Sequence, residues 1–286
     1  MQETGTIVNK LAVLMSGYEE RQLRRGYVDT SLGQLHYREC GNGTPIVLIH
    51  QTPSSSRMWE RLMTIFPDEY RLVAFDSPGF GNSDSPKKPL GITGYSAAIL
   101  EAMSQLDIRR AIVCGHHTGA SIGMEIAVTD QDRVRALILL GPFAPATALQ
   151  LHWWRSLVHR WEPDIQGDFV NDIVLPRLKM VTGASDAQHF LSELIGYLQA
   201  GPNYWWAYDS VFAYDALRRA ELVTQPSLIL VGELEAPDQV DMGRSVGELI
   251  PGSEFAIVSG GTSEMVSDVP DQVLEQLLPF LRRLKD

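Results

Sequence analysis

The chain has 286 residues, 44% of them hydrophobic and 21% charged, which supports one large buried core or a core with a subdomain. Its formal net charge of -11 argues against nucleic-acid binding, because displacing counterions from phosphates needs lysine and arginine. Two cysteines, Cys40 and Cys114, are too few for a disulfide framework, and the apolar stretch 11–15 is too short for a signal peptide or a membrane span. A cytoplasmic location is expected.

Short apolar runs between turn residues are typical of strands that are buried on both faces of a sheet. Stretches with helical spacing lie between these runs, for example at 96–103 and 121–127. Strands that alternate with helices predict an α/β fold, with a mostly parallel sheet and helices on both of its faces. The predicted strands are 45–49, 71–75, 111–114, 134–140, 227–231 and 254–258.

The segment 142–222 interrupts this alternation, because it shows helical patterns and no convincing strand. We expect an inserted helical lid there, with residues 1–141 and 223–286 forming the core domain. Many aromatic residues fall in the lid, where they either pack its interior or form an apolar wall over a substrate pocket. The candidate substrate-binding residues are Trp154, Trp205, Trp206 and Tyr208, from a group that also contains Trp153, Trp161, Tyr197, Tyr204 and Tyr214.

Four motifs follow one another along the chain: His-Gln-Thr-Pro at 50–53, Asp-Ser-Pro-Gly-Phe-Gly-Asn-Ser-Asp at 76–84, Gly-His-His-Thr-Gly at 115–119 and Gly-Glu-Leu-Glu at 232–235. Their order and spacing resemble the α/β-hydrolase family, in the lidded branch with epoxide hydrolases, dehalogenases and C–C bond hydrolases. The resemblance implies an eight-stranded, mostly parallel sheet and a small-molecule substrate. It implies no cofactor, and a homodimer is a further expectation because lidded members often dimerise.

Two departures from the family concern its catalytic residues. The Gly-x-nucleophile-x-Gly elbow carries His117 where serine is usual. The Gly-Gly pair at 260–261, which a histidine follows in the family, is followed here by Thr262, and the chain has no histidine after His189. A Ser-Asp-His hydrolase needs both the serine and the late histidine, so the sequence argues against ordinary serine esterase chemistry.

A literal Gly-x-Ser-x-Gly pattern does occur at 119–123, with Ser121 at its centre. An elbow must follow its strand directly, because the tight turn at that point exposes the nucleophile. Ser121 lies four residues after His117, about one turn into the next helix. We therefore expect Ser121 to serve in helix packing.

His117 is the candidate catalytic residue, and its candidate partners are Glu235, at the family's acid position, and Thr262. A carboxylate beside the ring would fix its tautomer and raise its basicity. Because the ordinary pKa of histidine is about 6.5, His117 would suit a general base, the role we favour over direct attack on a carbonyl. Glu264 is a second candidate partner, although a solvated loop carboxylate is the simpler interpretation.

The family's oxyanion hole implies that main-chain N–H groups of Gln51 and Thr118 hold the developing negative charge. The Gln51 side chain, in place of a glycine, either narrows this hole or contacts substrate. The resemblance gives His50 a place beside the substrate site, where it buttresses its loop, and gives His116 a structural role. Asp76 is expected to stabilise its own turn.

The histidines His50, His116 and His117 lack the spacing of a metal-ligand set, so no metal is expected.

Three functions stay open. The one we favour is hydrolysis of an ester, a lactone or an activated C–C bond in a small, largely apolar substrate. The second is a lyase, cyclase or cofactor-free oxygenase that begins by proton abstraction, and the third is ligand binding without turnover.

Overall fold

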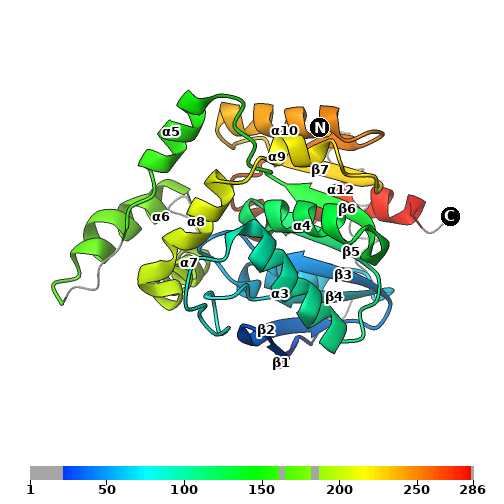
Figure 1. The fold of residues 1–286 in the computed structure, drawn as a ribbon, viewed down its shortest axis with the longest axis horizontal. Coiled ribbons are helices and arrows are strands. Elements are labelled where there is room, and N and C mark those ends of the chain that lie inside the picture. Colours follow the sequence, from blue (N-terminus) through cyan, green and yellow to red (C-terminus); the bar gives the residue numbers. More distant parts are fainter. Residues whose placement is uncertain (1–21, 161–164, 182–186, 285–286) are drawn as a thin grey trace, which may run out of the picture.

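An eight-stranded sheet forms the centre of the computed structural model, which describes residues 22–160, 165–181 and 187–284. The strand order is β1-β2-β4-β3-β5-β6-β7-β8 (Figure 1). The pairs β1–β2 and β2–β4 are antiparallel, and all other neighbouring strands are parallel. The strands are β1 (Arg24–Thr30), β2 (Gly33–Cys40), β3 (Thr44–Ile49), β4 (Tyr70–Phe75), β5 (Ala111–His116), β6 (Val134–Leu140), β7 (Ser227–Gly232) and β8 (Glu254–Val258).

The six predicted strands are confirmed as β3 to β8, and the mostly parallel, eight-stranded sheet is confirmed as well. Sequence patterns did not locate β1 and β2. In both strands buried residues are mixed with exposed and half-buried ones, so neither strand has the continuous apolar run that marks the central strands. Antiparallel strands at the margin of a sheet, such as the edge strand β1 and its neighbour β2, give this weaker pattern.

Helices cover both faces of the sheet, and the alternation of side chains along each strand explains why. In β3, Val47 and Ile49 belong to one buried cluster, whereas Ile46 and Leu48 belong to the cluster on the opposite face. The first cluster includes buried residues of α3 (Gly91–Gln105), α4 (Thr118–Thr129) and α10 (Pro237–Leu249); the second includes those of α2 (Glu60–Ile65), α11 (Met265–Asp268) and α12 (Pro270–Arg283). The core domain also contains two short 3-10 turns, η1 (Ser56–Trp59) and η2 (Gln131–Arg133).

The described part of 142–222, called the lid below, contains helices and no strand, and it lies to the left of the sheet in Figure 1. Its aromatic rings pack against one another, in the pairs Phe143–Trp154, Phe143–Phe212, Tyr208–Phe212 and Tyr204–Tyr208. Trp161 lies outside the described residues. The lid elements are α5 (Ala148–Ser156), the π-helical turn η3 (Val170–Val174), α6 (Leu175–Val181), α7 (Ala187–Ala200), η4 (Gly201–Asn203), α8 (Trp205–Phe212) and α9 (Ala216–Ala220).

Polar contacts attach both ends of the lid to core helices. Near its C-terminal end, Arg219 donates from Nε to Glu125 Oε2 at 2.8 Å and from Nη2 to the same oxygen at 2.6 Å, and Tyr214 Oη lies 3.1 Å from it. Glu125 belongs to α4 and its side chain is buried. Near the N-terminal end, Trp154 Nε1 donates to Asp238 of α10 at 3.0 Å.

Two composition-based expectations concern the cysteines and membrane insertion. Cys40 and Cys114 are both buried and form no disulfide. Among the described helices, none has the length and apolarity that a bilayer crossing needs.

Candidate functional site

The chain makes a strained strand-to-helix turn at His117, between β5 and α4, where φ is 47° and ψ is -106°. Two glycines make this turn sterically feasible. A Cβ atom on Gly115 would lie 2.0 Å from the carbonyl oxygen of Gly119, and one on Gly119 would lie 2.1 Å from that of Ile49. Glycine is therefore required at both positions, and the turn places His117 at the edge of the sheet where the parallel strands end.

The structure brings His117 and Glu235 together, although they come from different strand ends. His117 Nε2 lies 3.7 Å from Glu235 Oε2, and Glu235 Oε1 accepts a hydrogen bond from Gly232 N at 3.1 Å. One fifth of the His117 side chain is exposed (21%), but the Nε2 atom is buried and makes no hydrogen bond to the described residues. Gly141, which follows β6 with φ of +52°, leaves room for the ring, because a Cβ there would lie 2.7 Å from His117 Cε1.

Thr262 does not contact the His117 ring in the way the sequence suggests. Its Oγ1 donates to Asp268 Oδ2 at 2.6 Å and accepts from Glu264 N at 2.9 Å, so the hydroxyl is already engaged within its own loop. The loop instead reaches the ring through the main chain of Ser263, whose carbonyl favours a protonated imidazole. A catalytic role for Thr262 stays a prediction, and the contacts offer it no direct support.

Burial keeps both members of the His117–Glu235 pair uncharged near neutral pH. It lowers the pKa of His117 to about 4, against the opposing effect of the Gly141 and Ser263 carbonyls. Burial also raises the pKa of Glu235 to about 8, and the hydrogen bond from Gly232 N only partly offsets it. The expected rise in His117 basicity is therefore absent near pH 7, because a protonated carboxyl has no charge with which to stabilise an imidazolium.

His116 packs directly on the candidate catalytic ring. The two imidazoles are stacked with their centroids 4.5 Å apart and an interplanar angle of 20°, and the Trp59 and His116 rings form a T-shaped pair with their centroids 6.4 Å apart. His116 is fully buried, and burial followed by the proximity of His117 holds its pKa well below the ordinary value. These contacts agree with the structural role expected for His116.

His50 joins two loops through both of its ring nitrogens. Nε2 accepts from Ser77 N at 2.9 Å, so Nδ1 carries the proton and donates to Gln51 O at 2.7 Å. The ring therefore buttresses its loop, as the resemblance implied, and neither nitrogen is available to a substrate or metal. Within the described residues, no group of three or more His, Cys, Asp or Glu side chains is arranged to hold a metal ion.

The Gln51 side chain crosses to the loop after β8. Its amide nitrogen lies 2.7 Å and 2.6 Å from the two carboxyl oxygens of Glu264, and both side chains are buried. Gln51 therefore links two loops of the candidate site. Thr118 opens α4, where the first N–H groups of a helix have no partner within the helix. Main-chain N–H groups of Gln51 and Thr118 as oxyanion donors remain a prediction that this placement favours.

The lid contributes two site residues that sequence reasoning missed, His189 and Glu193 of α7. Both are buried, and Ser54 Oγ donates to Glu193 Oε1 at 3.1 Å. His189 Nε2 lies 3.9 Å from Glu264 Oε2 and 3.8 Å from Asp268 Oδ1. A histidine and a glutamate four residues apart in a helical stretch share one helix face, and this spacing was the available signal.

The buried carboxyls between the lid and the core tend to hold their protons. Burial raises the pKa of Glu193 to about 7, although the hydrogen bond from Ser54 opposes the shift and Asp268 adds to it. Burial and the neighbouring Glu193 raise the pKa of Glu264 well above its ordinary value, against the effect of the Gln51 amide. Glu193 and Glu264, like Glu235, therefore keep their protons to a higher pH than an exposed glutamate does.

The four candidate substrate-binding aromatics occupy different surroundings. Tyr208 Oη donates to the carbonyl of Thr52 at 2.7 Å, so this side chain reaches the 50–53 loop. Arg160 lies over the Trp205 ring at 4.2 Å, and Trp154 bonds to α10 as described above. Trp206 lines a shallow recess together with Pro78, Gly79, Phe80, Ser85, Pro86, Tyr95 and Asn203. Substrate contact stays a prediction for all four, with the most direct support at Tyr208.

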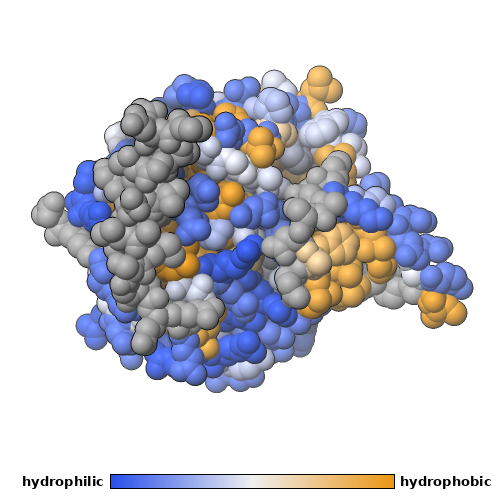
Figure 2. All heavy atoms as spheres, turned by 180° about the vertical axis from the view of Figure 1, so that it is seen from behind, coloured by the Kyte–Doolittle hydropathy of each residue, from blue (hydrophilic) through white to orange (hydrophobic). Residues whose placement is uncertain are grey.

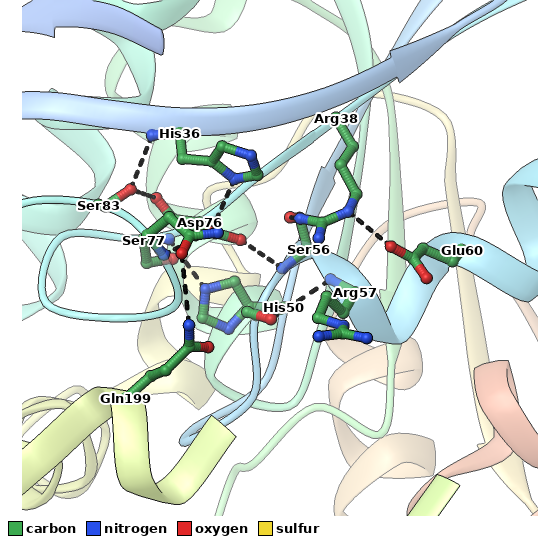
Figure 3. Close-up of polar contacts among 12 residues, drawn as sticks. His36, Arg38, His50, Ser56, Arg57, Glu60, Asp76, Ser77, Ser83 and Gln199 are labelled. Carbon is green, nitrogen blue, oxygen red and sulfur yellow. Dashed lines mark hydrogen bonds and ion pairs between the residues drawn. The ribbon is translucent and has the colours of Figure 1, made fainter. Parts of the chain in front are cut away.

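The 76–84 turn is fixed by Asp76, which is fully buried at the end of β4 (Figure 3). Its carboxylate accepts from Ser56 N at 2.6 Å, from Asn82 N at 2.9 Å and from His36 Nδ1 at 2.8 Å. Burial alone would raise the pKa of Asp76, but the His36 bond and the two main-chain donors lower it to about 2. Asp76 stabilises its turn as an ionised group.

The sheet order, the turn at His117 after a central strand and the helical insertion after β6 together define an α/β-hydrolase fold. Comparison with known proteins agrees, because the family described as alpha/beta hydrolase fold matches residues 44–175. The similarity to solved structures confirms this fold over almost the whole chain. An esterase from Thermogutta terrifontis superposes with a TM-score of 0.78 and 19% identity, covering 92% of this chain and 100% of that one. The enol-lactonase from Burkholderia xenovorans LB400 superposes with a TM-score of 0.71 and 21% identity, covering 90% of this chain and 100% of that one.

Sequence similarity to curated proteins is confined to part of the chain. Haloalkane dehalogenase 2 of Mycobacterium tuberculosis is 34% identical over 127 residues, which are 44% of this chain and 44% of the dehalogenase. The match thus spans less than half the length of this curated relative. The similarity relates this part of the chain to dehalogenases.

Proposed function

We propose that the protein is a cofactor-independent hydrolase that uses His117 as a general base on a small, largely apolar ester, lactone or activated C–C bond. The observation that carries the proposal is the position of the His117 ring, at the apex of a strained turn and 3.7 Å from a buried carboxyl. An α/β-hydrolase fold places its reactive residue at this turn. The esterase and the enol-lactonase with the same fold favour an ester or lactone carbonyl.

The proposed reaction needs a water molecule and two proton transfers. His117 removes a proton from water, and the hydroxide adds to the carbonyl carbon to form a tetrahedral oxyanion. Main-chain N–H groups of Thr118 and Gln51 stabilise this oxyanion. When the intermediate collapses, the bond to the leaving group breaks and the His117 imidazolium returns the proton to the leaving group. Ionised Glu235 stabilises the imidazolium, so the reactive state combines neutral His117 with a Glu235 carboxylate.

The test compares His117→Ala with Ser121→Ala on a panel of activated aryl esters and lactones. Removing the general base is expected to lower kcat/KM roughly 100-fold to 10,000-fold. Ser121 is buried in α4 one helical turn after His117, so Ser121→Ala is expected to stay within about twofold of the wild type. Loss of activity in Ser121→Ala with activity retained in His117→Ala would contradict the proposal, as would labelling of Ser121 by a phosphonate probe.

Hydrolysis in ¹⁸O-labelled water separates the proposal from the other reactions that one base could start. A hydrolase inserts one labelled oxygen into the acid product of each turnover. A lyase or cyclase forms products without the label, and a binding protein forms none while its affinity changes in His117→Ala. Unlabelled products, or binding without product, would contradict the assignment as a hydrolase.

A further inference from the structure

The Gln51–Glu264 link gives both side chains a place that the sequence did not suggest. Much of the face drawn in Figure 2 is hydrophilic, whereas Gln51 and Glu264 are only 6% and 5% exposed. Glu264 is therefore not a solvated loop carboxylate. The Gln51 amide nitrogen lies within 2.7 Å of both Glu264 carboxyl oxygens. The amide is thus held within the protein and is not left free for a substrate.

A glutamine side chain can stay bonded to a glutamate in both protonation states of the carboxyl. When Glu264 is ionised, its oxygens accept hydrogen bonds from the amide N–H groups of Gln51. When Glu264 is protonated, its O–H donates to the amide oxygen after the Gln51 amide has rotated by half a turn. The link therefore persists although burial raises the pKa of Glu264.

The main chain of Gln51 lies beside the strained turn at His117. A Cβ atom on Gly119 would lie 2.9 Å from the carbonyl oxygen of His50, so the start of α4 packs directly on the segment that leads into Gln51. The Gln51 carbonyl is fixed, because it accepts from His50 Nδ1 at 2.7 Å and from Ser54 N at 3.0 Å. Among the described residues, none accepts a hydrogen bond from the Gln51 main-chain N–H, so this donor is available to a substrate oxygen.

Bonds at both ends of Gln51 fix the orientation of this residue and therefore of its N–H. The carbonyl is held as described above, and Glu264 holds the end of the side chain, so rotation between these two anchors is restricted. The Ser263 carbonyl, next to Glu264 in the chain, reaches the His117 ring. The loop after β8 thus contacts both the candidate base and the candidate oxyanion donor through adjacent residues.

We propose that Glu264 is a positioning residue for the reaction, which acts through the Gln51 amide to hold the Gln51 main-chain N–H in the orientation that oxyanion stabilisation needs. The inference rests on the proposed function, because it requires the oxyanion that hydrolysis forms. Such stabilisation depends on donors that are already fixed when the charge develops. Glu264 is not assigned the proton of His117, since the carboxyl paired with that ring belongs to Glu235.

The first test measures kcat and KM separately on the panel of esters and lactones. Glu264→Ala frees the Gln51 side chain and should lower kcat roughly 10-fold to 100-fold with KM within about twofold, because the oxyanion is absent from the ground state. Glu264→Gln can still bond to the Gln51 amide and should recover most of the activity. Ser267→Ala is the matched control: the buried Ser267 hydroxyl bonds the same segment to the Met58 carbonyl, and its loss should leave kcat within about twofold.

Other roles of Glu264 predict other results, and each of them overturns the proposal. A rise in KM at constant kcat would show that Glu264 contributes to substrate binding in the ground state. Equal losses in Glu264→Gln and Glu264→Ala would show that the carboxyl itself takes part in the chemistry. Gln51→Ala combined with Glu264→Ala should be no slower than Glu264→Ala alone, because both changes remove the same link, so additive losses would show that the two side chains act independently.

Hydrogen exchange of the main-chain amides in residues 51–56 separates failure of this inference from failure of the proposed function. Exchange should become roughly tenfold faster in Glu264→Ala and stay as in the wild type in Ser267→Ala. Unchanged exchange in Glu264→Ala, or faster exchange with unchanged kcat, overturns the positioning role and leaves the hydrolase assignment intact. A wild type that forms no hydrolysis product overturns the proposed function and the oxyanion role together, and faster exchange in Glu264→Ala would then show only that Glu264 holds the loop.

Discussion

Two histidine–carboxyl pairs behave in opposite ways: one joins the neighbouring strands β2 and β4, and the other joins the ends of β5 and β7, which β6 separates. In the His36–Asp76 pair the ring nitrogen and the carboxylate are 2.8 Å apart, and the pKa of Asp76 is lowered to about 2. In the His117–Glu235 pair they are 3.7 Å apart, and the pKa of Glu235 is raised to about 8. Burial acts in the same direction on both carboxyls, so burial alone does not explain the difference.

The number of hydrogen-bond donors explains the contrast. The Asp76 carboxylate accepts hydrogen bonds from two main-chain N–H groups in addition to the histidine. Together these bonds offset the free-energy cost of burying its charge. Glu235 receives one such group, from Gly232, and therefore keeps its proton. The satisfied pair fixes a turn. The unsatisfied pair can change its protonation near neutral pH, as a catalytic base and its partner must.

The largest expected effect is loss of stability in Asp76→Asn. The amide would direct N–H hydrogens toward main-chain donors and remove a buried charge. The free energy of unfolding should therefore fall by about 3–5 kcal/mol. Denaturant unfolding at pH 7 measures it. Glu235→Gln is the matched control: its carboxyl is already uncharged, so the amide should cost less than about 1 kcal/mol. Equal costs in the two variants would remove the proposed distinction between the pairs.

A smaller effect is expected in the pH dependence of stability. The ordinary pKa of 4.5 for Glu235 rises to about 8 in the folded state, so between pH 7 and 8 the folded protein holds a proton that the unfolded chain has lost. Stability therefore falls with rising pH, by about 1 kcal/mol between pH 7 and pH 8 for Glu235. His117 is neutral in both states here and adds little. Denaturant unfolding at pH 7 and pH 8 should show the fall, and Glu235→Gln should reduce it; a rise in stability would contradict the raised pKa.

The smallest effect is expected in the pH–rate profile. Because the proposed reactive state needs ionised Glu235 and neutral His117, kcat/KM should rise through about pH 8 and level off above it. The rise should be no steeper than tenfold per pH unit, and Glu235→Gln should lose this step while it remains folded. A wild-type profile that is flat from pH 6 to 9 would show that Glu235 does not control the base.

The sequence predicted those parts of the molecule that depend on local pattern. Continuous apolar runs identified β3 to β8, and the pair of glycines around His117 identified the strained turn. Contacts between distant segments were not predictable in the same way. The Gln51–Glu264 link joins residues 213 positions apart, and no local pattern pairs them. The hydrogen bond of Thr262 was not predictable from local pattern either. The sequence suggested His117 as the partner of this hydroxyl, but in the structure the hydroxyl donates to Asp268.

The electrostatic state of the site was also beyond the sequence. An imidazole next to a glutamate suggests a basic histidine, but the pKa of each group depends on how many donors remain after burial. A helical wheel of α7 would place the polar residues His189 and Glu193 toward solvent. In the structure this face of the helix points inward, and both side chains are buried beside the loops of the candidate site.

The attachments at the two ends of the lid limit how a substrate can enter. Arg219, whose side chain is 30% exposed, holds the C-terminal end through an ion pair with the buried Glu125, and Trp154 bonds the N-terminal end to Asp238. A hinge at either end would have to break these contacts, so rotation of the lid as one rigid flap is disfavoured. We infer that any movement of the lid would instead involve the part between these two attachments, and a displacement of α7 would separate Glu193 from Ser54 and His189 from Glu264.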